Sequence, residues 1–203
     1  MESLKPKDKR KNINKKNIVD AAEKLFFTKG YNNSTMEQVA MEAGFTKRTL
    51  YSYFKSKEDI YEKIIQRGYE VLNKTFLDTL DEKKDSTELS KIKAMGYALI
   101  NFETDFPGYY KSIFEYDGSE TVPNELEETT IDILQKCVKE GIINGEITDR
   151  LDEVSISLIL WASIVGFVNT FSRKQKYIKD YFNKDSREVI EKGLDLVLDS
   201  IKK

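Results

Sequence analysis

The side chains that could perform covalent or acid–base chemistry are few in kind. The chain has 203 residues with 33 basic and 35 acidic side chains, no histidine and a single cysteine, Cys137. Without histidine, the catalytic triads that depend on imidazole and the imidazole general base are excluded. One cysteine forms neither an intrachain disulfide nor the ligand set of a structural zinc site. No pair of carboxylates lies in a recognisable motif, so we expect no enzyme, no metal, no cofactor and a reducing, cytoplasmic setting.

A different chemistry, hydrogen bonding to DNA, is offered by residues 47–54. Leu50 and Phe54 are four residues apart and predict the buried face of a helix over Lys47–Phe54. The outward positions carry side chains that bind bases and phosphates, namely Lys47, Arg48, Thr49, Tyr51, Ser52 and Tyr53. Lys57, at the start of the next helix, can reach a phosphate. The alternative is a helical packing unit with incidental surface charge, in which Tyr51 or Tyr53 is a core aromatic.

Helix caps surround this segment in an order typical of a helix-turn-helix. Thr35 with Gln38 predicts a capping box at the start of one short helix. Gly44 then suits the left-handed turn that ends it, and Thr46 is a natural N-cap for the next helix. Ser56 begins a third helix. A helix, a tight glycine turn and a second helix form the plan in which the second helix lies in the major groove.

The formal net charge of −2 conceals two opposed parts. Residues 1–60 contain 13 basic and 8 acidic side chains, a net charge of +5, whereas residues 61–203 contain 20 basic and 27 acidic side chains, a net charge of −7. This polarity indicates a basic end that meets a polyanion and an acidic body that does not. The basic N-terminal segment is expected to form a disordered arm over residues 1–12. Its alternative role is to aid solubility only.

Apolar residues recur at helical spacing almost throughout, and no stretch alternates as a strand does, so we predict an all-α fold. Pro107 and Pro123 are expected to open short helices. A long helix is predicted from Leu151 to Lys176 and a last one from Arg187 to Ile201. Residues 154–172 carry no charge and are long enough to span a membrane, but their serines, Asn169 and Thr170 favour a helix buried in protein.

Residues 13–65 resemble the N-terminal domain of the TetR family of bacterial transcriptional repressors. The resemblance rests on the composite spacing of residues Ile18 to Phe26, Gly30-Tyr31, Thr35 to Ala40, Ala43-Gly44, Thr49 to Tyr51, Tyr53-Phe54 and Ser56 to Glu58. Arg48 stands where many members have a small residue, and Phe45 is bulkier than the common valine. The operator therefore cannot be inferred from a relative.

The resemblance implies a homodimer that reads a palindromic operator. It implies a helix-turn-helix DNA-binding domain over residues 13–58 and a larger helical ligand-binding and dimerisation domain over residues 59–203. Lys47, Arg48, Thr49, Tyr51 and Tyr53 match positions that face the major groove. Thr35 and Lys57 match positions that hold phosphates, and Lys15 and Lys16 would flank the DNA backbone.

The resemblance also implies that a small lipophilic effector enters the body and releases the operator. The expected ligand-binding residues are Phe102, Phe106, Tyr109, Tyr110, Phe114 and Trp161. Nearby acids (Glu103, Asp105, Glu115 and Asp117) favour a lipophilic cation over an anion, or keep the body off DNA. The alternative for the aromatic residues is plain core packing.

A dimer seam is expected where the uncharged helix meets the last helix. The candidate residues are Trp161, Val165, Val168, Val189, Leu194 and Leu198, with Trp161 lining either the seam or the ligand pocket. The helix that starts at Ser56 would carry the effector signal, and Gly68 within it is a flex point or a place of close packing. The second hypothesis for the whole chain is a ligand-independent DNA-binding structural or nucleoid-associated factor.

Overall fold

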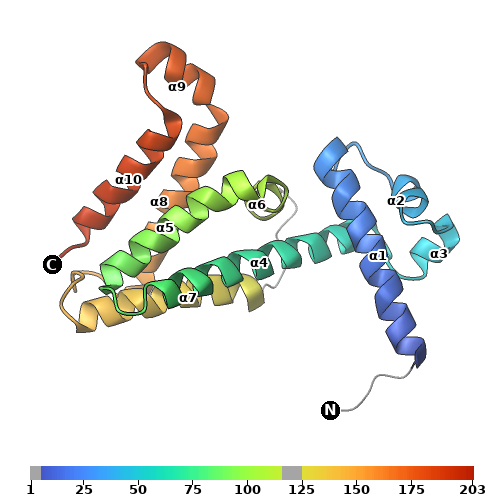
Figure 1. Ribbon diagram of the computed structural model, residues 1–203, viewed down its shortest axis with the longest axis horizontal. Coiled ribbons are helices and arrows are strands. Elements are labelled where there is room, and N and C mark those ends of the chain that lie inside the picture. The colour runs from blue at the N-terminus through green and yellow to red at the C-terminus, as the bar shows by residue number, and fades with distance from the viewer. Residues whose placement is uncertain (1–5, 116–124) are drawn as a thin grey trace. The chain divides into compact units, whose positions relative to one another are not determined.

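The computed structural model describes residues 6–115 and 125–203, and the part of the chain that it describes is helical without a named strand. The chain divides into two compact units, Met1–Arg67 and Gly68–Lys203. Figure 1 shows the helices, which are α1 (Pro6–Lys29), α2 (Met36–Glu42), α3 (Lys47–Tyr51), α4 (Lys57–Glu82), α5 (Glu88–Asp105), α6 (Pro107–Phe114), α7 (Glu125–Ile143), α8 (Glu153–Arg173), α9 (Gln175–Phe182) and α10 (Ser186–Ser200). The all-α prediction is confirmed.

The first unit follows the predicted caps closely. The Thr35 hydroxyl accepts from the Gln38 backbone N–H and the Gln38 side chain accepts from the Thr35 backbone N–H, so the capping box at the start of α2 is present. Gly44 has φ +72° and ends α2, and the Thr46 side chain caps α3 by accepting from the Thr49 backbone N–H. The predicted helix over Lys47–Phe54 is shorter than expected, because α3 ends at Tyr51. Beyond it, the Ser52 hydroxyl donates to the Thr49 carbonyl at 2.6 Å.

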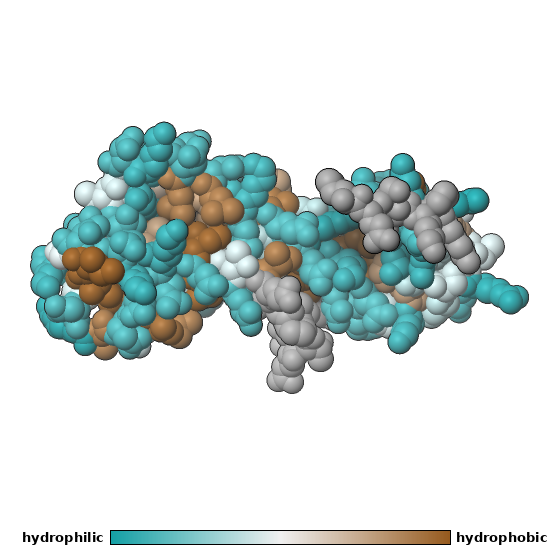
Figure 2. Space-filling model, turned by 90° about the horizontal axis from the view of Figure 1, so that it is seen from below, coloured by the Kyte–Doolittle hydropathy of each residue, from teal (hydrophilic) through white to brown (hydrophobic). Residues whose placement is uncertain are grey.

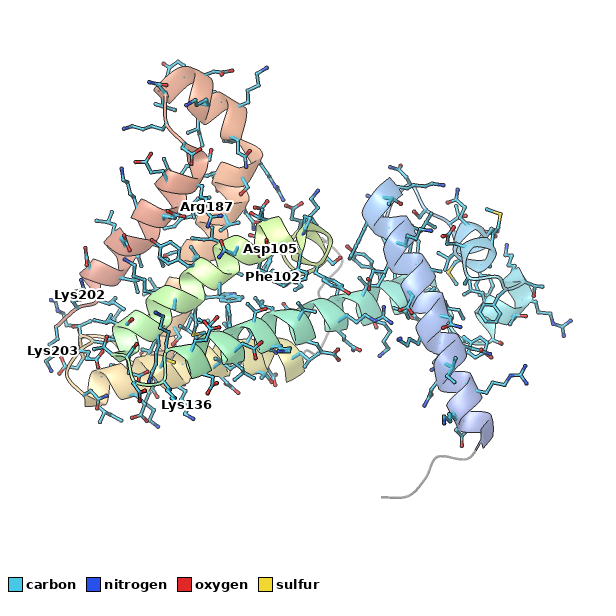
Figure 3. All side chains as sticks on the ribbon, in the orientation of Figure 1. Phe102, Asp105, Lys136, Arg187, Lys202 and Lys203 are labelled. Atoms are coloured by element: carbon cyan, nitrogen blue, oxygen red, sulfur yellow. The ribbon has the colours of Figure 1, made fainter. Side chains whose placement is uncertain are left out.

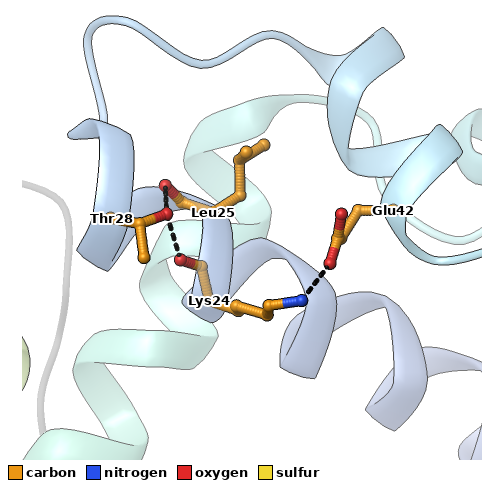
Figure 4. A network of polar contacts seen from close by, with 4 residues as sticks. All are labelled: Lys24, Leu25, Thr28 and Glu42. Atoms are coloured by element: carbon orange, nitrogen blue, oxygen red, sulfur yellow. Dashed lines mark hydrogen bonds and ion pairs between the residues drawn. The ribbon is translucent and has the colours of Figure 1, made fainter.

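The core of the first unit joins α1, α2, α3 and the start of α4. Ile18, Val39, Leu50 and Ile60 are fully buried, one from each of these helices. Fixed polar contacts support this packing at the surface, as in the ion pair of 2.6 Å between Lys24 of α1 and Glu42 of α2 (Figure 4). The helix-turn-helix is therefore held by its own core.

Helix α1 begins earlier than the sequence analysis predicts. Residues 6–12 belong to the expected disordered arm, but α1 starts at Pro6 and they are helical. Proline at the first helical position, Asp8 in the first turn and lysine-rich sequence after it all suit a helix start. The expected helix start at Pro123 lies outside the described residues.

The second unit is a helical body in which α8 packs against α7, α10 and α5. One face of α8 (Ile156, Leu160, Ile164 and Val168) is buried in this core. In length and apolar composition α8 would suffice to cross a membrane, the one such helix among the described residues, and 28% of its most apolar stretch is buried inside the structure. Its opposite face leaves Leu158 and Ile159 about half exposed, at 51% and 47%. Figure 2 shows apolar residues reaching the surface among polar ones.

The predicted helix from Leu151 to Lys176 is wrong at its C-terminal end. Helix α8 ends at Arg173, Lys174 leaves helical geometry with φ −112° and ψ 18°, and the unpredicted helix α9 follows. Asn183, in the left-handed conformation at φ 51°, ends α9. Asp185 then caps α10 by accepting from the Glu188 backbone N–H. The polar composition of residues 174–185 conceals this short helix.

Gly68 is a place of close packing between α4 and α6. A Cβ atom at this position would lie 3.0 Å from the Ile113 Cδ1 atom and 3.4 Å from the Tyr109 Cβ atom. Of the two roles expected for Gly68, this geometry supports close approach. Helix α4 is thereby held against the aromatic helix α6 of the body.

Cys137 should be a poorly reactive thiol. It is buried in α7, and burial followed by the nearby Glu88 carboxylate raises its pKa to about 11 from an ordinary value of 9.0. At pH 8 the thiolate fraction is then about 100-fold below that of an ordinary cysteine. We expect alkylation by iodoacetamide at least 100-fold slower in the native protein than in the protein unfolded in guanidinium. Equal rates before and after unfolding would contradict this environment.

Candidate nucleic-acid interface and ligand cavity

Helix α3 presents most of the predicted base-reading side chains to solvent. Lys47, Arg48, Tyr51 and Ser52 are exposed, Thr49 is half-buried, and Leu50 beneath them is fully buried. Among the described residues, the Arg48 guanidinium has no hydrogen-bond or ion-pair partner. It is therefore free to make two parallel hydrogen bonds to a guanine edge, the commonest specific contact in the major groove.

Lys47 is less free than Arg48. Its ammonium group forms an ion pair with Glu37 of α2 and lies 5.9 Å from the centre of the Tyr51 ring. The hydrogen bond between the Lys47 and Glu37 side chains raises the pKa of Lys47 and lowers the pKa of Glu37. This exposed pair fixes α2 beside α3 and offsets part of the positive charge that Lys47 would bring to DNA.

Tyr53 and Lys15 tie α1 to the end of the reading segment. The half-buried Tyr53 hydroxyl accepts a hydrogen bond of 2.7 Å from the Asn14 side-chain amide of α1. The Lys15 ammonium lies 5.9 Å from the centre of the Phe54 ring. Asn14 was not anticipated from the sequence, since nothing in its spacing marks it as a partner of Tyr53. Lys16 and Thr35 are exposed, so both remain accessible to a phosphate.

Lys57 holds the connection between α1 and α2. Its ammonium group donates to the carbonyl oxygens of Tyr31 at 2.8 Å and Ser34 at 3.0 Å, and it lies 4.0 Å from the centre of the Tyr31 ring. The Tyr31 hydroxyl in turn donates to the neighbouring Glu58 carboxylate at 2.7 Å. A phosphate would have to compete with these contacts, and the sequence alone gave no sign of them.

Lys57→Ala should therefore destabilise the protein. Loss of two charge-assisted hydrogen bonds and a cation–π contact predicts a fall of about 2 kcal/mol in the free energy of unfolding, measured by urea titration. Lys55→Ala is the matched control, because the Lys55 side chain is exposed and its backbone N–H still donates to Asp59. Unchanged stability together with a smaller salt dependence of DNA binding would instead favour the phosphate contact.

An apolar cavity of about 30 Å³ lies in the second unit. Its lining is apolar apart from Ser163 and consists of Phe76, Ile92, Met95, Gly96, Leu99, Leu134, Leu160, Trp161, Ser163, Ile164, Phe167, Leu194 and Val197. Ligand pockets for drug-sized molecules usually measure 300–1,000 Å³, so this cavity is too small to hold such a molecule. Among the described residues, no acidic or basic side chain lines the cavity.

Only Trp161 of the six predicted ligand-binding residues lines this cavity. The centre of the Trp161 ring lies 5.8 Å from the centre of the Phe114 ring, and the Phe114 and Tyr110 ring centres are 4.7 Å apart. Phe114 and Tyr110 therefore form a second aromatic layer beside Trp161. Phe102, which Figure 3 labels, lies in the C-terminal part of α5 and is buried. Phe106 is 40% exposed, and Tyr109 is half-buried. Aliphatic lining residues such as Met95 and Leu99 were missed because their helical spacing does not distinguish a cavity wall from solid core.

Three residues predicted for the dimer seam have little exposed surface within one chain. Val168, Leu194 and Leu198 are buried within one chain, and the Leu194 side chain packs directly against Gly96. Trp161 lies at the cavity. Val165 and Val189 are half-buried and remain partly available. The periodicity identifies apolar positions on these helices but does not say which apolar face points inward.

The fold and its first unit define a class: a DNA-binding regulator with a helix-turn-helix domain joined to a helical body. Residues 18–64 match the family model described as bacterial regulatory proteins, tetR family. The chain is a transcriptional regulator, and its residues 18–64 form a DNA-binding domain of the TetR type.

Two curated relatives extend the likeness into the body. The chain is 26% identical over 164 residues to the fatty acid metabolism regulator protein of Bacillus subtilis, covering 79% of this chain and 84% of the relative. It is also 26% identical over 168 residues to the HTH-type transcriptional regulator QacR of Staphylococcus aureus, covering 79% and 87%.

A solved structure shows the same fold. The transcriptional regulator FadR from Bacillus subtilis, in complex with stearoyl-CoA, superposes with a TM-score of 0.69 at 22% identity, covering 91% of this chain and 98% of that one. These relatives are regulators that bind DNA, and none of them is described as an enzyme.

Proposed function

We propose that the chain is a cytoplasmic, homodimeric repressor that reads a palindromic operator and releases it when an apolar effector enters the body. The observation that carries the proposal is the combination in one chain of an exposed reading helix, α3, and a separate apolar cavity. Residues 13–58 read DNA, and residues 59–203 sense the effector and dimerise. The similarity to a fatty acid metabolism regulator favours a ligand-responsive regulator over a ligand-independent architectural factor.

The chemistry of the cavity wall favours a hydrocarbon chain. A carboxylate that would balance the charge of a lipophilic cation is absent from the described cavity wall, because Glu103, Asp105 and Glu115 do not line the cavity and Asp117 lies outside the described residues. The aromatic part of the wall consists of Phe76, Trp161 and Phe167. The similarity to a fatty acid metabolism regulator and the fold shared with a complex of stearoyl-CoA support a long-chain acyl thioester. We therefore propose an uncharged acyl chain in place of the cation.

The proposed dimer uses the outer faces of α8 and α10. Leu158, Ile159 and Ala162 are exposed on α8, and Leu196 of α10 is 72% exposed. A Cβ atom at Gly166 would meet nothing within 4 Å, so the helix surface there is open to a close neighbour. A two-fold axis would place this surface against its own copy.

Release follows from differential affinity. An effector lowers operator affinity only by as much as it prefers the conformation that binds the operator poorly. Helix α4 is the element that transmits this preference, because it begins in the reading unit and its Gly68 packs closely against α6.

The deciding experiment selects bound sequences from random duplex DNA and then adds effector. A palindromic consensus with half-sites about one helical turn or a multiple apart supports the dimeric reading. Stearoyl-CoA should then release that DNA. Selected sequences without two-fold symmetry, or binding unaffected by any long-chain thioester, would contradict the proposal.

A further inference from the structure

The short helix α9 carries aromatic side chains that are largely exposed in the described part of the chain. Tyr177, Tyr181 and Phe182 are 55%, 72% and 54% exposed, whereas Ile178 on the same helix is buried. The Tyr177 and Tyr181 rings are stacked with their centres 5.6 Å apart and their planes 14° apart. Such a stack offers a flat, solvent-facing aromatic surface to another planar ring.

Cations surround this stack. Residues 173–187 contain six basic and two acidic side chains, a net charge of +4 within a body of net charge −7. Arg173 is paired with Glu115 and Arg187 with Glu191. The remaining four, Lys174, Lys176, Lys179 and Lys184, have no ion-pair partner among the described residues. The charge is complementary to an anion that carries more than one phosphate.

A groove brings the rings and the cations together. It has a volume of about 560 Å³ and is lined by Arg173, Lys174, Lys176, Tyr177, Asp180 and Tyr181. Lys176 also lines a second groove of about 450 Å³ on α9, together with Lys179 and Lys184. Lysine ammonium groups hold phosphates as point charges, and tyrosine rings stack on nucleobases. A phosphorylated nucleotide combines both features.

Helix α8 contributes residues both to the apolar cavity and to this groove. Phe167 lines the cavity and Arg173 lines the groove, six residues further along the same helix. Six residues of helix advance about 9 Å, a distance that the linear carrier of an acyl thioester can span. We propose that the groove on α9 binds the phosphorylated nucleotide end of the thioester whose acyl chain enters the cavity. This inference rests on the proposed function and adds a separate recognition site for the carrier.

The test measures binding of three probes by calorimetry: stearoyl-CoA, coenzyme A and free stearate. The double variant Lys176→Glu, Lys179→Glu should bind stearoyl-CoA and coenzyme A at least 10-fold more weakly and stearate as the wild type does. The variant Tyr177→Ala, Tyr181→Ala should lose about 5-fold for the same two probes. Lys136→Glu, Lys139→Glu is the matched control, since both lysines are exposed on α7 and neither lines a groove. Figure 3 labels Lys136.

Each outcome separates this inference from the proposed function. If coenzyme A binds through the α9 lysines but stearoyl-CoA does not release operator DNA, the groove is supported and the proposed effector response fails. If stearoyl-CoA releases DNA with equal affinity in the wild type and the α9 variants, the groove assignment is overturned. The groove assignment would also be overturned if the α7 control weakened binding of stearoyl-CoA and coenzyme A as much as the α9 variants do. Weaker operator binding by the α9 variants without any effector would overturn it too, because α9 would then be a DNA contact.

Discussion

Arg48→Ala is expected to weaken binding to the selected operator by about 5- to 150-fold per half-site, because a bidentate contact to a base contributes about 1–3 kcal/mol. Its guanidinium is exposed and unpaired within the described part of the chain, so the substitution should leave the fold intact. Fluorescence anisotropy with labelled operator and with a scrambled duplex measures the effect.

The comparison between the two duplexes identifies the role of Arg48. A base contact predicts a large loss on operator and a small one on scrambled DNA. An equal loss on both would mean a phosphate contact. Lys16→Ala is the matched control on α1: this exposed lysine is proposed to flank the backbone, so its loss should be similar for both sequences.

Leu158→Glu is expected to have the second large effect, on assembly. If Leu158 lies in the seam, the two-fold axis brings both new carboxylates into one desolvated interface, and each unpaired buried charge costs several kcal/mol. Sedimentation at micromolar concentration should then show a monomer, and operator affinity should fall by more than 100-fold.

Leu77→Glu supplies the comparison, since Leu77 of α4 is 53% exposed and Leu158 is 51% exposed. The control should remain dimeric and bind operator as the wild type does. A Leu158→Glu variant that stays dimeric would place the seam elsewhere. Unchanged circular dichroism of both variants separates loss of assembly from loss of folding.

Local chemistry made the reading unit predictable. The capping box of Thr35 and Gln38, the turn at Gly44 and the cap at Thr46 are each specified within a few residues, and the structure contains all three. Contacts over long sequence separations were not predictable in the same way. The hold of Lys57 on the Tyr31 carbonyl depends on how α4 returns to α1, which no local pattern encodes.

The body was predictable as helices but not as a cavity. Helical spacing marked Trp161 and Leu194 as apolar positions, but it did not show that both line a cavity. Leu194 was expected in a dimer seam instead. Which apolar face of α8 or α10 points inward depends on the neighbouring helices. The break at Lys174 and the helix α9 escaped prediction because residues 174–185 mix charge with aromatic rings.

The closed cavity sets the concentration at which the proposed sensor responds. At about 30 Å³ it must open before an acyl chain can enter, so only a fraction of molecules is competent at any moment. The apparent dissociation constant rises in inverse proportion to that fraction, and each 1.4 kcal/mol of opening free energy raises it about tenfold. In the proposed sensor, the packing of Trp161 and Phe167 at the cavity would thus act as a threshold, and the operator would stay occupied until the effector is abundant.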